Sequence, residues 1–394
     1  MIVRLGECIE QIRGVSYKPE DLHDSLDADS VILLRANNIK DGQLNFDDVV
    51  YVDKTRVKNS QFLKQGDILV CASSGSKDLV GKAAYVDKDM TVTFGAFCKV
   101  VRPIIKNPKY IAHYFQSPIY RQEISNLSSG ANINNIRNEH IDELMITLPD
   151  EDIQIQTVGL LDKVSILLAL RKKQLSKLDE LVKSRFIEMF GDPVVNPMNW
   201  ETSLLKNVTS KIGSGATPKG GKESYQNEGV TLIRSMNVHD GRFEYKDLAY
   251  ITDEQAKQLD NVIIEENDVF INITGASVAR SCIVPKHILP ARVNQHVAII
   301  RCIPSILNPV FANNMFLNIS FKGQLLDIGE SGGATRQAIT KQQLEILDVI
   351  LPPIDLQNEF AVFAEQIGKL KSEIKESLEK LDTLKKSLMQ KYFG

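Results

Sequence analysis

The chain has 394 residues, of which 43 % are hydrophobic and 25 % charged, and this composition predicts a soluble protein of two to four domains. Its five cysteines lie far apart, with no CxxC pair and no Cys/His cluster, so the sequence indicates neither a zinc site nor a disulfide framework, and we expect a reducing cytoplasm and no metal. The first residues lack the apolar core of a signal peptide, and we identify no apolar run near the roughly 18–20 residues of a membrane span.

The net charge of −3 does not suggest nucleic-acid binding, but the charges are unevenly distributed. Residues 82–137 carry eight Lys and Arg against three Asp and Glu, and residues 280–341 carry seven against two, so each stretch has a net charge of +5. Two equally basic stretches are able to neutralise phosphates. Two ordinary solvated surfaces are the alternative interpretation.

An internal repeat determines the order of the segments along the chain. Residues 34–42 return as residues 233–241, at a spacing of 199. Residues 151–191 return as residues 354–394, at a spacing of 203, and both copies end in Phe-Gly. The repeat predicts four segments, which are globular, helical, globular and helical in turn.

The globular copies, residues 1–150 and 193–352, contain short apolar runs bounded by Gly, Asn and Asp, which predict strands. Asp-Gly pairs in both copies predict turns, and residues 109–127 and 310–328 predict helices. We therefore expect an α/β (α+β) protein with two strand-rich domains in tandem, each followed by a long helix.

The helical segments, residues 151–192 and 353–394, carry apolar residues at heptad spacing over a length too great for a core helix of a small domain. Each seam is interrupted where the other is strong, which favours an antiparallel coiled coil; two separate amphipathic helices are the alternative. The expected coiled-coil residues are Leu161, Leu168, Leu175, Leu178, Val182, Ile367, Ile374, Leu378, Leu381 and Leu388.

Motifs for catalysis are incomplete. Residues 107–110 read Asn-Pro-Lys-Tyr, similar to the NPPY loop of adenine methyltransferases but with Lys at the third position, so Asn-Pro opening a helix is the simpler account. Residues 213–223 approach a phosphate-binding loop, but Ala216 stands where Gly is needed and Glu223 where Ser or Thr must reach Mg²⁺. We expect no catalytic residue in this chain.

Polar loops occur in both copies. Residues 71–77 match residues 272–277, and residues 129–137 match residues 332–338. Asn and Gln pair with adenine, Arg pairs with guanine, and Ser, Thr and Lys bind phosphate, although the same residue types also build ordinary turns. The candidate DNA-binding residues are Arg35, Asn37, Asn38, Ser73, Ser74, Lys77, Lys82, Asn132, Asn134, Asn135, Arg137, Thr217, Lys219, Arg234, Asn237, Asn272, Thr274, Ser277, Arg280, Thr335, Arg336 and Gln337.

Over its whole length the chain resembles the specificity subunits of type I restriction–modification enzymes. The resemblance rests on the pattern R-x-x-N-[IV]-x-x-G from Arg234 with its counterpart at Arg35, on residues 215–218 and 332–337, and on the helix ends. In the first copy, residues 14–17 and 132–134 depart from the pattern.

The resemblance implies two target-recognition domains that each read one half of a bipartite DNA site, and helices that dock two methyltransferase subunits, joined by restriction subunits. It implies that S-adenosylmethionine binds to the partner and that this chain has no cofactor. Two other classes stay open, which are a module of a related type II-like restriction–modification system and a coiled-coil structural protein without a DNA function.

Overall fold

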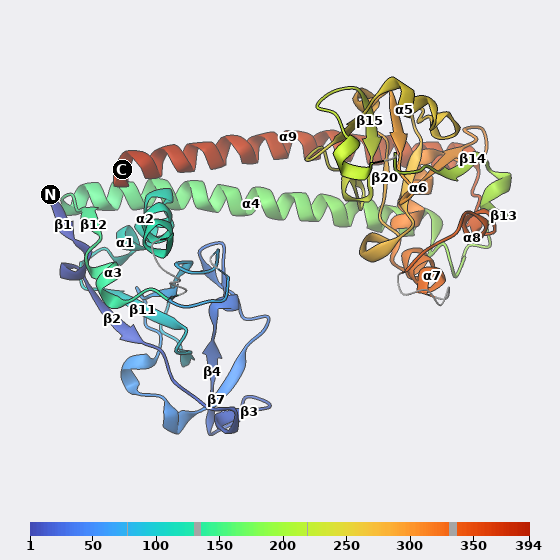
Figure 1. Cartoon of the computed structure of the whole chain (residues 1–394). Helices are drawn as coiled ribbons and strands as arrows, with labels where there is room; N and C mark the ends of the chain where they lie inside the picture. Colours follow the sequence, from blue (N-terminus) through green and yellow to red (C-terminus); the bar gives the residue numbers. More distant parts are fainter. Residues whose placement is uncertain (77, 130–134, 219, 331–336) are drawn as a thin grey trace. The chain divides into compact units, whose positions relative to one another are not determined.

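The computed structural model describes residues 1–76, 78–129, 135–218, 220–330 and 337–394 (Figure 1). The chain forms two compact units, of which unit 1 comprises residues 1–173 and 375–394, and unit 2 comprises residues 174–374. Each unit therefore contains one globular copy together with parts of both long helices. The sequence boundaries at residues 150, 192 and 352 treat the helices as separate domains, whereas the two units divide each helix near its middle.

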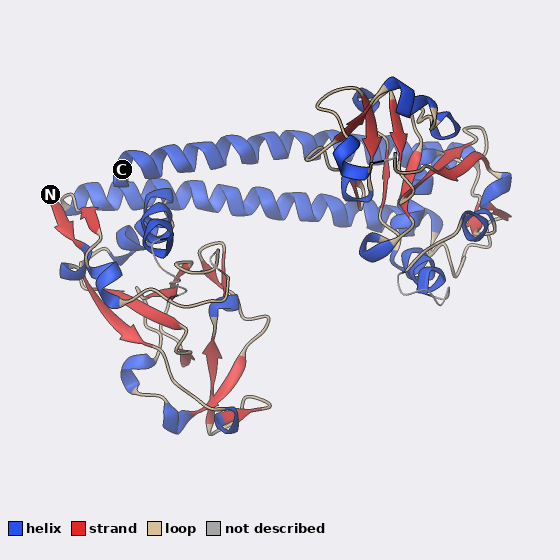
Figure 2. Ribbon diagram, in the orientation of Figure 1, coloured by secondary structure: helices blue, strands red, loops and turns tan. Residues whose placement is uncertain are grey.

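The first globular copy is built on two four-stranded sheets (Figure 2). The central sheet is antiparallel and has the order β2 (Ile9–Arg13), β11 (Cys98–Pro103), β8 (Ile68–Cys71), β9 (Ala83–Tyr85). The second sheet has the order β10 (Val92–Phe94), β4 (Ser30–Leu34), β7 (Val50–Asp53), β3 (Leu22–His23), and β1 (Ile2–Arg4) pairs with β12 (Met145–Thr147). All four residues of β8 are buried, which explains its unbroken apolar sequence.

The second globular copy repeats this arrangement. Its central sheet has the order β14 (Thr209–Ser214), β22 (Val297–Cys302), β19 (Val269–Asn272), β20 (Ser281–Ile283). Its other strands are β15 (Val230–Ile233), between β18 (Ala249–Ile251) and β21 (Ala291–Val293), and β13 (Thr202–Leu204), which pairs with β23 (Asp348–Ile350). The tandem of strand-rich domains predicted from the repeat is confirmed.

The two Asp-Gly pairs form hairpin turns, as predicted. Asp41-Gly42 joins β5 (Ile39–Lys40) to β6 (Gln43–Leu44), and Asp240-Gly241 joins β16 (Val238–His239) to β17 (Arg242–Phe243). Gly42 and Gly241 have φ angles of 79° and 63°, the left-handed region that glycine adopts without steric cost.

Each of the two helices predicted at residues 109–127 and 310–328 is divided in two. In the first copy α1 (Pro108–Phe115) is followed by α2 (Pro118–Ser129), because proline cannot continue a helix and restricts the residue before it. In the second copy α6 (Pro309–Leu317) is followed by α7 (Ile319–Glu330), and the Asn318 carboxamide accepts the backbone N–H of Ser320 at 2.9 Å, which caps the new helix. Three shorter helices are α3 (Asn138–Asp142), α5 (Asp253–Lys257) and α8 (Lys341–Glu345).

The long helices α4 (Glu151–Phe190) and α9 (Ile354–Phe393) run antiparallel in each unit (Figure 1). In unit 1, Leu161 of α4 packs in the same core cluster as Phe393 of α9. In unit 2, Asp179 forms an ion pair with Lys371 and Arg185 forms one with Glu359. All ten expected coiled-coil residues are buried or partly buried, and the antiparallel coiled coil of the predicted fold class is confirmed.

Helix α4 corrects the expectation that no apolar run approaches the length of a membrane span. It contains an 18-residue window with a mean hydropathy of 1.5, of which 28 % is buried. The helix resembles a membrane span by length and composition only, and one of its faces contacts α1 of the same chain. Asp162 of α4 lies 2.9 Å from Lys109 Nζ and 2.9 Å from His113 Nε2, both on α1.

Candidate nucleic-acid interface

One end of the central sheet gathers loops that are far apart in the sequence. In copy 1, Cys71 at the end of β8 is opposite Cys98 at the start of β11. Arg13 at the end of β2 is opposite Lys99, which also belongs to β11. The loops after β8, after β2 and before β11 therefore emerge at the same end of the sheet, together with the polar residues that they carry.

Backbone hydrogen bonds join these loops. The carbonyl of Phe97 accepts the N–H groups of both Ala72 and Ser73 at 2.9 Å. Ser73 forms a β-bridge with Asn135, and the N–H of Ile136 donates to the Ala72 carbonyl at 2.7 Å. We call residues 71–76, 95–97 and 135–137 the loop face of copy 1. The structure thus brings the candidates Ser73, Ser74, Asn135 and Arg137 into one surface region.

The turn that begins at Arg35 lies beside the same loop face. Strand β4 runs parallel to β10, with Leu34 opposite Phe94, and the N–H of Gly95 donates to the Leu34 carbonyl at 2.9 Å. The Arg35 guanidinium lies 3.0 Å from an Asp48 carboxylate oxygen, which also accepts the amide of Asn37 at 2.6 Å. Arg35 and Asn37 are therefore held by an acidic partner at the edge of the loop face.

Copy 2 builds the same face from residues 272–280, 294–296 and 337–338. The N–H of Ile273 donates to the His296 carbonyl at 3.0 Å, as that of Ala72 does to Phe97. Thr274 forms a β-bridge with Ala338, equivalent to the bridge between Ser73 and Asn135. The N–H of Gly275 donates to the Gln337 carbonyl at 2.9 Å. The candidates Thr274 and Gln337 thus lie together.

Side-chain hydrogen bonds connect the copy 2 loop face to the candidate Thr217. The Thr217 hydroxyl contacts the Gln295 side-chain oxygen, and Gln295 Nε2 lies 3.2 Å from His296 Nε2. His296 Nδ1 in turn contacts the Thr274 hydroxyl. Gln295 and His296 are not among the residues predicted from the sequence. In copy 2 a short polar turn, residues 294–296, directly precedes the buried strand β22, and this is the signal that identifies them.

Three candidate asparagines do not belong to the surface. Asn38, Asn237 and Asn272 are fully buried. The amide of Asn38 donates to the carbonyls of Asn45 and Asp48, both at 2.8 Å, and its oxygen accepts the N–H of Arg35 at 2.8 Å. We correct their assignment from DNA contact to internal support, since their side chains are directed to the backbone.

Asn237 makes equivalent bonds in copy 2, to the carbonyls of Glu244 and Lys246 and to the N–H of Arg234. Asn272 donates to the carbonyl of Ser235 at 2.9 Å. In the R-x-x-N pattern the asparagine therefore stabilises a turn, and this turn orients the arginine.

The cationic candidates occupy matched positions. The N–H of Cys71 donates to the Lys82 carbonyl at 2.8 Å, and that of Asn272 donates to the Arg280 carbonyl at 2.9 Å. Lys82 is exposed, and Arg280 is half-buried. Ser277, another candidate, is one turn before Arg280, whose N–H donates to its carbonyl at 3.2 Å.

Arg234 is the remaining candidate DNA-binding residue among those that the structure describes. The Arg234 guanidinium carbon lies 5.5 Å from the centroid of the Tyr225 ring, and the guanidinium donates to the Asp247 carbonyl. The candidates that lie outside the described residues are Lys77, Asn132, Asn134, Lys219, Thr335 and Arg336.

A buried lysine supports the copy 1 loop face. Lys99 Nζ donates to Gln11 Oε1 at 3.0 Å and to Asn138 Oδ1 at 2.7 Å. Burial lowers the pKa of Lys99 to about 8, against the nearby Asp142 carboxylate, which raises it. Asn138 begins α3 and directly follows residues 135–137, while Lys99 lies in β11, the strand that follows residues 95–97. The bond from Lys99 to Asn138 therefore joins the ends of these two loop segments. Lys99 was not predicted from the sequence, where a lone lysine in an otherwise apolar strand is the signal that identifies it.

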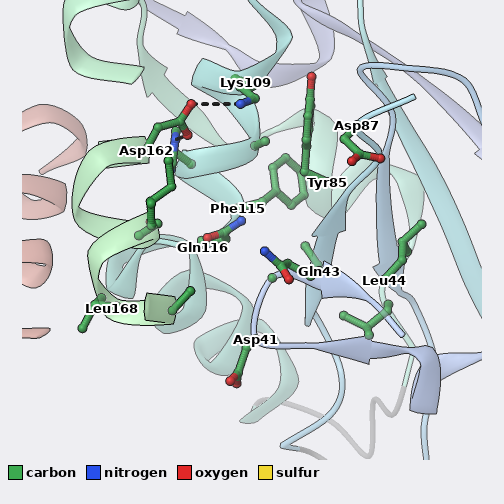
Figure 3. A pocket seen from close by; sticks show the side chains of 18 of the residues that line it. Asp41, Gln43, Leu44, Tyr85, Asp87, Lys109, Phe115, Gln116, Asp162 and Leu168 are labelled. Carbon is green, nitrogen blue, oxygen red and sulfur yellow. Dashed lines mark hydrogen bonds and ion pairs between the residues drawn. The ribbon is translucent and has the colours of Figure 1, made fainter. Parts of the chain in front are cut away.

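A cleft lies between the copy 1 hairpin and the long helices. This cleft has a volume of about 1100 Å³ and is lined by residues of β5, β6, α1, α4 and the end of α9. Figure 3 shows Gln43 and Leu44 of the hairpin on one side and Asp162 and Leu168 of α4 on the other. Its lining mixes lysines, aspartates and apolar side chains.

The chain is similar to known proteins over nearly its whole length. The model of the family described as "Type I restriction modification DNA specificity domain" matches residues 2–180 and 197–383. The type I restriction enzyme StySPI specificity subunit of Salmonella potsdam is 28 % identical, over 97 % of this chain and 86 % of that protein. The EcoKI specificity subunit of Escherichia coli K12 is 26 % identical, with the same coverage.

Solved structures share the fold. The crystal structure of a type I restriction–modification system S subunit from M. genitalium aligns with a TM-score of 0.59 at 13 % identity, and covers 100 % of this chain and 96 % of that one. A chain from a structure of type I R-M complex assembly and conformational transition aligns with a TM-score of 0.57 at 16 % identity, and covers 100 % and 97 %. The two domains matched by the family model are the two globular copies with their helices.

Proposed function

Because the chain belongs to the family of type I restriction modification DNA specificity domains, with two copies of the domain, we propose that each loop face reads one half of a bipartite DNA site. The chain is a DNA-specificity subunit of a type I restriction–modification system, and a coiled-coil structural protein without a DNA function is set aside. The recurrence of the same loop face in both copies carries the proposal.

The chemistry of the loop faces supports base reading. Ser73, Asn135, Thr274 and Gln337 offer donors and acceptors beside the matched cations Lys82 and Arg280. Cations bind phosphates without regard to sequence, whereas amides and hydroxyls discriminate base edges. Differences between the two loop faces then assign different bases to the two half-sites.

The test is to map methylated adenines in a host that produces this chain with its methyltransferase partner. We expect a motif of two short specific halves separated by a spacer of fixed length. Substitution in one loop face changes one half only. A single contiguous motif, or no motif, contradicts the proposal.

We further propose that the chain contributes no catalytic group and that S-adenosylmethionine binds to the partner methyltransferase. The incomplete Asn-Pro-Lys-Tyr motif supports this division, since Pro108 begins α1 and Tyr110 is buried with its hydroxyl donating to the Thr147 carbonyl at 2.8 Å. Methyl transfer to DNA by the isolated chain with S-adenosylmethionine contradicts it.

The long helices supply the proposed docking surface for two methyltransferase subunits, to which restriction subunits add. On α4, Ile166, Leu167 and Leu170 are 58 %, 46 % and 56 % exposed, and none of the three occupies a seam position of the heptad. A contiguous apolar surface of this kind is typical of a protein interface. Leu170→Glu is expected to abolish copurification with the methyltransferase and to leave DNA binding by the chain intact, while Lys177→Glu on the same helix serves as the charge control.

The proposed compartment is the cytoplasm, where the DNA substrate and the partner subunits are present. All five cysteines are free and buried, which suits a reducing compartment.

A further inference from the structure

Phe97 is an exposed aromatic residue of the copy 1 loop face. Its side chain is 72 % exposed, the largest exposure of any Phe or Tyr in the described residues. An aromatic ring left in water forgoes the free energy of burial, so a partner that covers it gains that free energy. The position therefore favours contact with a binding partner.

Backbone hydrogen bonds fix the turn that carries the ring. The Phe97 carbonyl accepts two N–H groups, from Ala72 and Ser73, and the N–H of Cys98 donates to the Gly95 carbonyl at 2.8 Å to close the turn. Gly95 is in turn bonded to Leu34, directly before Arg35. The ring is thus carried by a turn that is hydrogen-bonded to residues 72 and 73 of the loop face and to the strand that precedes Arg35.

The equivalent position in copy 2 carries a different chemistry. His296 has the same backbone role as Phe97, since its carbonyl accepts the N–H of Ile273. Its ring is half-buried and contacts the side chains of Thr274 and Gln295. One fold position thus presents an apolar ring in one copy and a hydrogen-bonding ring in the other, the pattern expected of a residue that distinguishes two half-sites.

The surroundings of Phe97 favour DNA over a protein as the partner. Ser73 and Asn135 on the adjacent segments are polar, and Lys82 is at the same end of the sheet. A protein interface core requires a contiguous apolar patch, whereas a single ring among polar groups suits a base edge. In the major groove the apolar group that a base presents is the C5-methyl of thymine, and Phe is among the residues that contact it.

We propose that Phe97 reads a thymine by packing its ring against the C5-methyl group, and that the turns 95–97 and 294–296 are specificity-determining elements of the two recognition domains. This inference rests on the proposed loop faces. It adds a chemical assignment, which is that the half-site read by copy 1 contains a thymine whose methyl group contributes to binding.

The experiment replaces each thymine of the mapped site by deoxyuridine, one at a time, which deletes only the methyl group. The full chain in complex with its methyltransferase is titrated with these duplexes. We expect affinity to fall about fourfold at one thymine of one half-site, the effect of removing one buried methyl. Phe97→Ala is expected to lower affinity for the parent duplex by a similar factor and to abolish the effect of that one replacement.

Matched variants separate the outcomes. Phe97→Leu keeps an apolar contact and retains part of the methyl effect, while Phe46→Ala, at a 43 % exposed Phe of the same copy, retains all of it. His296→Ala leaves the methyl effect unchanged, since it belongs to the other half-site. These variants also show whether the loss at Phe97 reflects the ring or a general defect.

Three results separate the proposed loop faces from the thymine assignment. Absence of any preferred DNA site for the unsubstituted complex refutes the proposed loop faces. A preferred site whose methyl dependence is absent, or survives in Phe97→Ala, overturns the thymine assignment alone. Loss of methyltransferase binding in Phe97→Ala with unchanged DNA preference also overturns it, because the ring then serves a protein interface.

Discussion

The ring of Phe190, the last residue of α4, lies 4.7 Å from the ring of Phe311 in α6, edge to face. In unit 1 the ring of Phe393, the last residue of α9, lies 5.1 Å from that of Tyr110 in α1. Phe190 and Phe393 hold the same place in the repeat, and both are buried. Each long helix therefore ends within the core of a globular copy, which explains why the repeat extends to its closing Phe-Gly.

Phe393→Ala is expected to lower the free energy of unfolding of unit 1 by about 3–5 kcal/mol, the usual cost of removing a buried Phe ring. Hydrogen exchange of the α1 amides reports unit 1, and exchange of the α6 amides reports unit 2. Phe190→Ala is the matched control and accelerates exchange in α6 instead. Equal acceleration in both helices for either variant contradicts the assignment of each ring to one core.

Asp162 gives unit 1 a dependence on acid. Its hydrogen bond with His113, together with that from Lys109, lowers the pKa of the Asp162 carboxyl to about 2 against the burial that raises it. Since the pKa is lower in the folded state, the stabilisation is present above about pH 4 and is lost as the pH falls toward 2.

Asp162→Asn is therefore expected to destabilise unit 1 near pH 7 by at most about 2 kcal/mol, since the side chain is 32 % exposed. The difference from the unsubstituted chain narrows in urea titrations below about pH 4. Glu180→Gln, which removes an exposed ion pair with Lys177, is expected to change stability by less than about 0.5 kcal/mol. A difference that stays constant down to acid pH refutes the titration argument.

Asn237→Ala separates internal support from base reading. The variant leaves the carbonyls of Glu244 and Lys246 and the N–H of Arg234 without their partner, which costs about 1–3 kcal/mol of stability. The bases recognised are expected to stay the same in a methylation map. A changed base preference at unchanged stability shows instead that Asn237 reads a base, and Asn37→Ala at an exposed site is the stability control.

The sequence was sufficient for the fold class because its evidence was periodic. The heptads of α4 and α9 and the repeat at spacings of 199 and 203 each involve many residues, so no single exception changes the result. The break between α1 and α2 was missed at Pro118, although proline is a local signal, since the apolar pattern on both sides suggests one helix. The ends of the elements depend on such single residues.

The candidate interface was predicted only in part. Residue type identified Ser73 and Thr274, which the structure places on the loop faces, but also Asn38 and Asn237, whose amides are used by the backbone. Asn is suited to base edges and to turns by the same two groups, so its type does not distinguish these roles. Phe97 was missed because an apolar residue next to a buried strand reads as core until its exposure is known.

Lys82→Ala and Arg280→Ala test whether the matched cations bind phosphate. Lys82 lies beside the copy 1 loop face and Arg280 lies in the copy 2 loop face, so each substitution removes one cation near a different half-site and is expected to weaken DNA binding by the complex evenly across sequences. The slope of log affinity against log salt falls by about 0.9 for each phosphate that is no longer neutralised, and the two effects add in the double variant. A change in the recognised bases with an unchanged slope shows instead that the side chain reads a base.

The long helices are expected to set the spacer between the half-sites, because α4 and α9 are the elements shared by the two units. One heptad inserted after Leu175 and another after Leu378 preserve the seam and keep the antiparallel pairing, since these residues lie close to the middle of each helix. Seven residues lengthen the coiled coil by about 10 Å. At about 3.4 Å per base pair the spacer grows by at most roughly three base pairs.

The measurement is a genome-wide map of methylated adenines for the double insertion and the parent chain, each produced with the methyltransferase. Both half-sites are expected to keep their bases, because the loop faces are unchanged, while the spacer lengthens. A heptad inserted in α4 alone is the control, since it places the two helices out of register and is expected to abolish methylation. An active double insertion that keeps the parental spacer refutes the helices as the ruler and assigns that role to the partner subunits.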